Sequence, residues 1–181
     1  FTPSYPPEGN PSASLETIET ETLAHLVGVF ATERDLPYSI ELDPSNRNIL
    51  TFSDCLGKTA RLGMMCGAAG IPPTEMRIRT CRFDWRQFAL PENIAQISPT
   101  ENGDHVYLEL VLFYDMHGAP VWGCLDPTCD PKIGSILPGE YWDGEHPTTC
   151  AVLPLEEPNT LTLEEFLDTD WIDEDLSRHN H

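Results

Sequence analysis

Three residues that follow one another along the chain, Cys55, His105 and Asp126, are of the types that carry out nucleophilic chemistry. A free thiol has a pKa near ~8.5, so little of it is thiolate at neutral pH. The unpaired N–H groups at a helix start and a nearby imidazolium both stabilise the thiolate. A carboxylate that accepts from the second ring nitrogen fixes the tautomer of the imidazole. A thiol, an imidazole and a carboxylate together can thus supply a nucleophile, a general base and a group that orients the base.

Cys55 stands at the beginning of a predicted helix that covers about residues 54–69, within "SDCLGKTARLGMMCGAAGIPP". Ser53 is its expected N-cap, and Gly70 followed by two prolines predicts its end. The stretch carries few charges, which is typical of a buried helix. Its glycines and alanine predict close packing against a sheet.

His105 opens the clearest predicted strand, "HVYLELVLFY", and Asp126 closes the next one, "VWGCLDP". The Gly-containing segment between them predicts a hairpin. A turn centred on His117 would place Asp126 opposite Leu108. Leu108 lies three residues beyond His105, which corresponds to ~10 Å of strand. A β-bulge or a tighter turn is therefore required to bring His105 and Asp126 together.

The remaining chain predicts a mixed α+β domain. We expect an extended lead over residues 1–14, one domain over 15–160, and a short helix with an acidic tail over 161–181. Within the domain, a helix over residues 15–31 capped by Ser14 and a strand in "EMRIRTCRF" are expected. A long connection covers residues 84–104. Thr162 and Glu165 form a capping box at the start of the last helix.

Composition narrows the classes of partner. The chain has 181 residues and a formal net charge of −20, which disfavours binding to nucleic acid or to an anionic membrane. No apolar run reaches the ~20 residues of a membrane span. The six cysteines include no Cys-x-x-Cys pair, so we expect reduced, buried thiols and a cytoplasmic protein. Because the chain begins at Phe1, a secreted or periplasmic location stays open.

Four motifs in order, "DCLGKTA", "AAGIPP", "HVYLEL" and "WGCLDPT", resemble the transglutaminase-like superfamily of papain-type cysteine enzymes. The resemblance covers about residues 20–130. It implies a papain-like core with a buried central helix on an antiparallel sheet or half-barrel, and a catalytic triad of Cys55, His105 and Asp126. The family often has glycine where this chain has Ser53, and an upstream tryptophan or glutamine that holds the oxyanion. No tryptophan precedes Trp85 and no glutamine precedes Gln87, so one oxyanion donor stays unassigned.

The resemblance implies cysteine-dependent hydrolysis of an amide in a peptide or protein substrate. Acyl transfer to an amine, as in transglutaminases, is the first alternative, and a catalytically inactive binding module is the second. We expect no cofactor and no metal, and the sequence does not fix the oligomeric state.

Other residues of chemical interest receive less specific interpretations. His25 and His117 are expected to be solvated or structural, and His146 is the reserve candidate for the base. Cys66, Cys81, Cys124 and Cys150 are expected in the core. Cys129 is near Asp126 in the sequence, which would allow a redox role, but we do not favour it. Four aromatic side chains are candidates for lining a substrate cleft: Trp85, Trp122, Tyr141 and Trp142.

Overall fold

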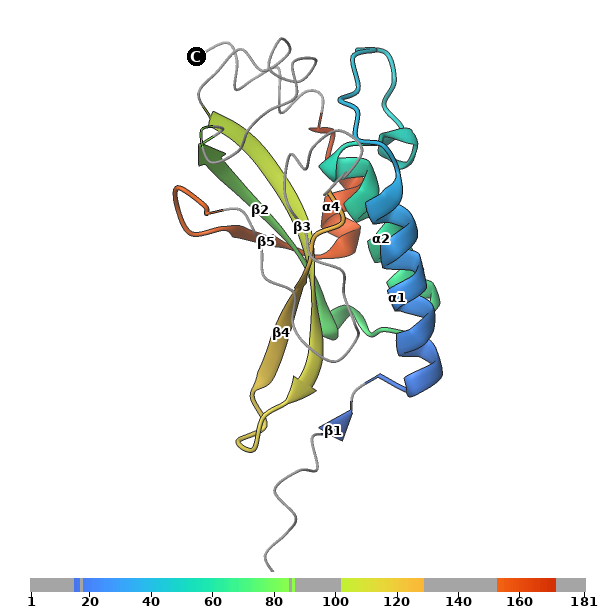
Figure 1. The fold of residues 1–181 in the computed structure, drawn as a ribbon. Coiled ribbons are helices and arrows are strands. Elements are labelled where there is room, and N and C mark those ends of the chain that lie inside the picture. Colours follow the sequence, from blue (N-terminus) through green and yellow to red (C-terminus); the bar gives the residue numbers. More distant parts are fainter. Residues whose placement is uncertain (1–14, 17, 85, 87–101, 129–152, 172–181) are drawn as a thin grey trace, which may run out of the picture.

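A computed structural model describes residues 15–16, 18–84, 86, 102–128 and 153–171 (Figure 1). The elements along the chain are β1 (Leu15–Glu16), α1 (Thr20–Asp35), η1 (Ile49–Thr51), α2 (Cys55–Ala68), η2 (Pro73–Glu75), β2 (Met76–Asp84), β3 (Asn102–Tyr114), β4 (Pro120–Leu125), β5 (Asn159–Leu161) and α4 (Leu163–Asp168).

The strands form one antiparallel sheet with β3 at its centre. The order is β1-β3-β2-β5, and β4 pairs with β3 as well. The helices α1, α2 and α4 gather on one side of this sheet (Figure 1). The arrangement confirms the predicted α+β class.

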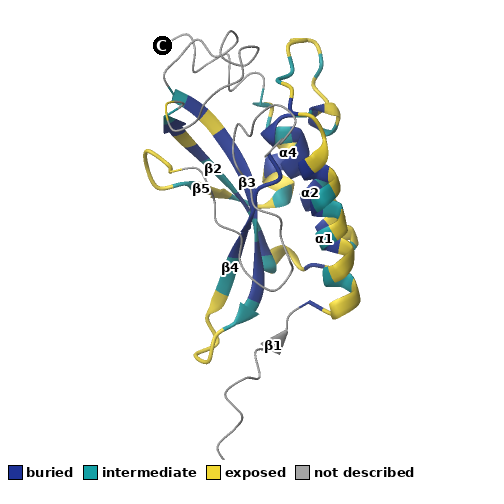
Figure 2. Cartoon of the chain, viewed as in Figure 1, coloured by how far each residue is buried: buried dark blue, intermediate teal, exposed yellow. Residues whose placement is uncertain are grey.

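The hydrophobic core lies between these helices and the sheet. Leu26 and Phe30 of α1, Leu62 of α2 and Leu108 of β3 belong to one buried cluster, together with Phe166 of α4. Figure 2 shows the buried residues concentrated where the sheet and helices meet, whereas the outer side of α1 is exposed. None of the helices in the described ranges has both the length and the apolar character that a membrane span needs.

The predicted first helix begins too early. Residues Leu15–Glu16 form strand β1, which pairs with Tyr114 and Phe113 of β3, and α1 begins at Thr20. Backbone pairing with the sheet therefore takes the segment that the apolar spacing assigned to a helix. The N-cap position of α1 is Glu19, so the prediction of Ser14 as the cap is wrong.

The other elements agree with the sequence more closely. The strand in "EMRIRTCRF" corresponds to β2, and the predicted hairpin corresponds to β3 and β4. The capping box of Thr162 and Glu165 is present at α4. Strand β5 was not predicted. The domain boundaries themselves stay a prediction, since residues 1–14 and 172–181 lie outside the described part.

The small residues of α2 pack differently from the prediction. A Cβ atom at Gly63 would lie 2.8 Å from Leu163 Cδ1, so Gly63 admits the neighbouring helix α4 rather than the sheet. Gly67 has nothing near its Cβ position. The predicted stop at Gly70 is confirmed by its φ of 96°, in the left-handed region.

Candidate functional site

His105 and Asp126 form a buried pair at one end of the β3–β4 hairpin. His105 Nε2 lies 2.7 Å from Asp126 Oδ2, and the two side chains are 1% and 4% exposed. The backbone N–H of Thr128 donates to Asp126 Oδ1 over 3.1 Å. Burial alone would raise the pKa of Asp126. The charge of His105 and the hydrogen bonds from His105 and Thr128 outweigh this effect, so the pKa of Asp126 is lowered.

A β-bulge brings the two residues of this pair closer together along the hairpin. Beside the turn, Phe113 is opposite Val121, but further along the hairpin Val111 is opposite Trp122. The register therefore shifts by one residue, and Leu125 instead of Asp126 stands opposite Leu108. The expected irregularity is therefore present, and it removes one of the three residues that separate Asp126 from His105 along the hairpin.

The start of α2 is fixed by Asp54 and Gly57. Asp54 is the N-cap, because its Oδ1 accepts from Gly57 N over 3.2 Å, so the prediction of Ser53 as cap is wrong. A Cβ atom at Gly57 would lie 2.1 Å from the carbonyl oxygen of Phe52. The chain entering the helix therefore folds so tightly over the first turn that only glycine fits, and this turn carries Cys55.

Cys55 contacts the strand residue that follows His105. The Val106 backbone hydrogen-bonds the Cys55 sulfur, and Thr59 Oγ1 donates to Val106 O over 3.3 Å. The pairing of β3 with β4 ends at Leu108, and the first turns of α2 contact β3 beyond this point, where β4 leaves its edge open. The fold thus brings Cys55, His105 and Asp126 to one end of the sheet.

The Nδ1 atom of His105 is buried and has no hydrogen-bond partner among the described residues. Phe83 meets the imidazole edge-on at 6.1 Å between centroids, and Tyr107 stacks on it at 5.8 Å. These rings shield the imidazole, and Nδ1 is the nitrogen left over once Asp126 binds Nε2. In this structure Cys55 does not hydrogen-bond Nδ1.

The pKa of Cys55 is raised, not lowered as expected from its place at a helix start. Burial is the main cause, and the negative charge of Asp54 is the second. The hydrogen bond from Val106 acts in the opposite direction. Since the N-cap is itself an acid, its charge opposes the positive end of the α2 dipole. The resting Cys55 side chain is therefore a neutral thiol.

Asp54 is also perturbed. Burial raises its pKa from 3.8 to about 6, although backbone hydrogen bonds from Gly57 and Leu56 partly offset this effect. The charge next to Cys55 therefore changes within the range just below neutral pH.

Tyr38 is a site residue that the sequence analysis missed. Its side chain is buried, and its pKa is raised by burial and by the charges of Cys55, Asp54 and Asp126. The bridge between Ser39 and Ser53 holds its segment against the start of α2. A search for upstream aromatic residues of any type, rather than for tryptophan or glutamine, would have found it.

A second buried thiol lies beside the pair. Cys81 of β2 is directly opposite His105 of β3, and burial raises its pKa to about 11, with a smaller contribution from Asp126. Cys81 and Cys66 are free and buried, as predicted. Cys124 is buried, as predicted, but it is disulfide-bonded, so the expectation of a reduced thiol is wrong at this position. Cys129 and Cys150 lie outside the described residues.

The other candidates are placed as follows. His25 and His117 are exposed. Trp122 is half-buried beneath the Arg77 guanidinium, 4.0 Å from its ring centroid. The reserve base His146 lies outside the described residues, as do Trp85, Tyr141 and Trp142. Within the described residues, no group of three His, Cys, Asp or Glu side chains is placed to hold a metal ion.

Comparison with protein-family models, curated proteins and solved structures gave no match for this chain.

Proposed function

We propose that the protein is a cysteine-dependent amide hydrolase that acts on a peptide or protein through Cys55, His105 and Asp126. One observation supports this proposal above the others: the buried His105–Asp126 pair leaves Nδ1 unpartnered, while the Cys55 sulfur contacts the residue next to His105. The proposal includes membership of the transglutaminase-like superfamily and a papain-like core.

The polarity of the pair suits a general base. Asp126 is a carboxylate with a lowered pKa, so it accepts a hydrogen bond from the N–H at Nε2 of His105. A neutral imidazole protonated at Nε2 carries its lone pair on Nδ1. Nδ1 is then the atom that takes the proton of Cys55.

The reaction begins with transfer of the Cys55 proton to His105 Nδ1. The sulfur attacks the amide carbon, and the resulting oxyanion collapses as the C–N bond breaks and His105 returns the proton to the leaving amine. Water then attacks the thioester while His105 accepts a proton from it. The C–S bond breaks, the acid leaves and His105 reprotonates the thiolate.

The oxyanion requires two donors. The backbone N–H of Cys55 is at the start of α2, where helix N–H groups have no partner within the helix. Tyr38 is our candidate for the second donor, because its buried side chain belongs to the segment that the Ser39–Ser53 bridge holds beside the start of α2. Tyr38 would thus take the place of the upstream tryptophan or glutamine.

A binding module without catalysis is the second candidate. The raised pKa of Cys55 favours it, because a buried neutral thiol is a poor nucleophile unless a base removes its proton. Transglutaminase-type transfer uses the same thioester and differs only in the acceptor.

The disulfide at Cys124 favours an oxidising compartment over the cytoplasm that the cysteine pattern suggested.

Acylation of the full chain by p-nitrophenyl acetate tests the proposal. We expect a burst of one p-nitrophenolate per chain and one acetyl group on Cys55 by peptide mass spectrometry. Cys55→Ala should abolish the burst and His105→Ala should slow it, whereas Cys66→Ala, which removes another buried thiol of α2, should leave it unchanged. No burst in the parent would favour the binding module. Incorporation of a labelled amine into a glutamine peptide would instead indicate transfer.

A further inference from the structure

Lys58 is a fully buried cation near the candidate site. It lies on α2 three residues after Cys55, and its relative exposure is 0%. Its Nζ donates to three main-chain carbonyl oxygens: those of Arg34 over 3.5 Å, of Leu36, and of Pro127 over 3.5 Å. Lysine is almost never fully buried without partners, since desolvation of its charge is costly.

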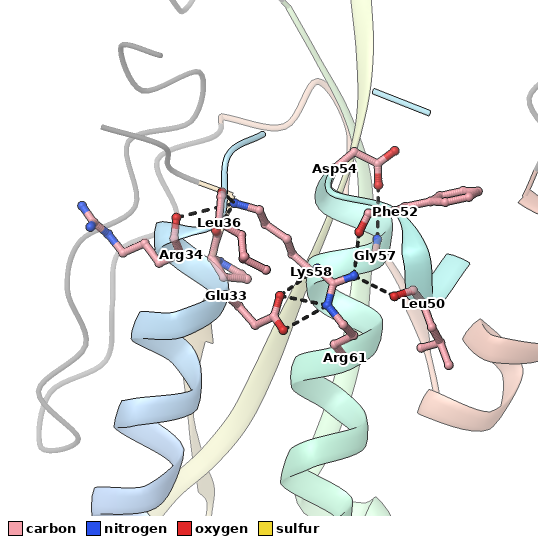
Figure 3. A network of polar contacts seen from close by, with 10 residues as sticks. Glu33, Arg34, Leu36, Leu50, Phe52, Asp54, Gly57, Lys58 and Arg61 are labelled. Carbon is pink, nitrogen blue, oxygen red and sulfur yellow. Dashed lines mark hydrogen bonds and ion pairs between the residues drawn. The ribbon is translucent and has the colours of Figure 1, made fainter. Parts of the chain in front are cut away.

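The end of α1 explains how this burial is tolerated. The last carbonyl groups of a helix have no partner within the helix and form the negative end of its dipole. Arg34 and Leu36 supply two such carbonyls, and Figure 3 shows the Lys58 side chain extending from α2 to them. The ammonium group therefore completes the hydrogen bonding of α1.

The third carbonyl belongs to the segment that carries the acid. Pro127 directly follows Asp126, and Leu36 stands two residues before Tyr38. A single ammonium group thus joins the helix of the nucleophile, the segment of Tyr38 and the turn of Asp126.

We propose that Lys58 is a positioning residue that keeps Asp126 in place against His105 by holding the carbonyl of Pro127 to the end of α1. The inference rests on the proposed function, since it assigns a task to the residue that supports the triad. Without Lys58 the turn that carries Asp126 loses a hydrogen bond that fixes it, and the 2.7 Å contact with His105 loosens.

A neighbouring ion pair separates this role from simple helix packing. Arg61, one turn further along α2, binds Glu33 of α1 through two nitrogens, with a shortest distance of 2.8 Å (Figure 3). The other acceptors of Arg61 are carbonyls of Leu50 and Phe52, before α2. The Arg61–Glu33 pair thus also joins α1 to α2, but the hydrogen bonds of Arg61 go to Glu33, Leu50 and Phe52 and not to Pro127.

The test compares Lys58→Met with Glu33→Gln in the full chain. Iodoacetamide alkylation of Cys55 is measured across pH, and the His105 Nε2–H signal is followed by ¹⁵N NMR. We expect Lys58→Met to slow alkylation near pH 7 by about 10- to 100-fold and to broaden or shift the His105 signal, as misplacement of a catalytic group does. Glu33→Gln should lower the unfolding temperature and leave the alkylation profile and the His105 signal unchanged.

The possible outcomes distinguish the two claims. If alkylation of Cys55 is fast in the parent, and Lys58→Met changes neither the alkylation rate nor the His105 signal, the role of Lys58 is overturned. The proposed function then still stands. A parent whose Cys55 reacts as slowly as in His105→Ala overturns the proposed function and, with it, the role assigned to Lys58. Should Lys58→Met fail to fold, NMR of the parent decides: couplings between Lys58 Nζ and the Pro127 carbonyl carbon support the inference, and rapid exchange of the ammonium protons with water contradicts it.

Discussion

The imidazole of His105 is held by Asp126 through a 2.7 Å contact from which water is almost fully excluded. Two features of the hairpin produce this relationship: the bulge between Val111 and Phe113, and the end of β4 one residue before the acid. Asp126 binds Nε2 of the ring, and Nδ1 has no hydrogen-bond partner among the described residues.

Replacement of Asp126 by asparagine should weaken both stability and reactivity. Because the folded state lowers the pKa of Asp126, its carboxylate stabilises the fold above the unfolded value near ~3.9, and this contribution disappears as pH falls through the lower folded value. We expect a loss of about 1–3 kcal/mol at pH 7 and no difference from the parent at the lowest pH where both fold. Urea unfolding across pH measures this difference, and an equal loss at every pH would contradict the argument.

Replacement of Asp54 by asparagine should stabilise the folded state above the Asp54 pKa, in contrast to the replacement of Asp126. The folded state raises the Asp54 pKa from 3.8 to about 6, so ionisation in the folded protein costs about 3 kcal/mol. That cost is absent below the unfolded pKa and grows as pH rises to about 6. Asparagine is an equally good N-cap. We expect Asp54→Asn to be more stable than the parent at pH 8 and no more stable at pH 4.

The same substitution should activate the thiol. Removal of the Asp54 charge takes away the second-largest cause of the raised Cys55 pKa. Alkylation of Cys55 near pH 7 should therefore be faster in Asp54→Asn than in the parent, as measured by timed quenching and mass spectrometry. A slower reaction would mean that the carboxylate assists the thiol.

Tyr38→Phe should slow the acylation of Cys55 but not its alkylation. Acylation develops an oxyanion, and loss of one oxyanion donor typically slows such a step by about 100- to 1000-fold. Alkylation by iodoacetamide develops none, so its rate should change little. Stopped-flow measurement of the p-nitrophenolate burst gives the first rate. Parallel losses in both reactions would indicate that Tyr38 supports the fold and not the oxyanion.

Gly57→Ala should displace the start of α2. The added methyl group would lie 2.1 Å from the Phe52 carbonyl oxygen, and overpacking of this kind costs about 1–3 kcal/mol. Gly67→Ala on the same helix is the matched control, since nothing lies within 4 Å of its Cβ position. The control should gain about 0.5–1 kcal/mol from helix propensity. Thermal unfolding of both variants checks the difference, and equal effects would contradict the close approach at Gly57.

Local patterns predicted the elements, and long-range contacts decided the details that the site needs. Alternation in β2 and the capping box at Thr162 are local and were predicted correctly. Strand β1 was mistaken for helix because its partner is Tyr114, almost a hundred residues away in the chain. The three residues of β5 are too short to show a period, although they pair with β2.

The candidate site shows the same division between what local patterns predict and what long-range contacts decide. Residue types and order predicted the contact of His105 with Asp126, but the register shift that brings the two residues closer comes from a bulge, which has no signature in this sequence. The environment of Cys55 was predicted with the wrong sign, because burial and the charge of Asp54 depend on packing. No local pattern marks Lys58 as a buried residue, since its carbonyl partners come from distant segments.

The pH dependence of iodoacetamide alkylation, read at Cys55 in the parent and in His105→Ala, tests the central claim most directly. If His105 receives the Cys55 proton, Cys55 should be labelled faster than Cys66 and Cys81 well below pH 8, and this advantage should disappear in His105→Ala. Cys55 labelling that is as slow as that of the other two thiols, and unchanged by loss of the imidazole, would contradict the account.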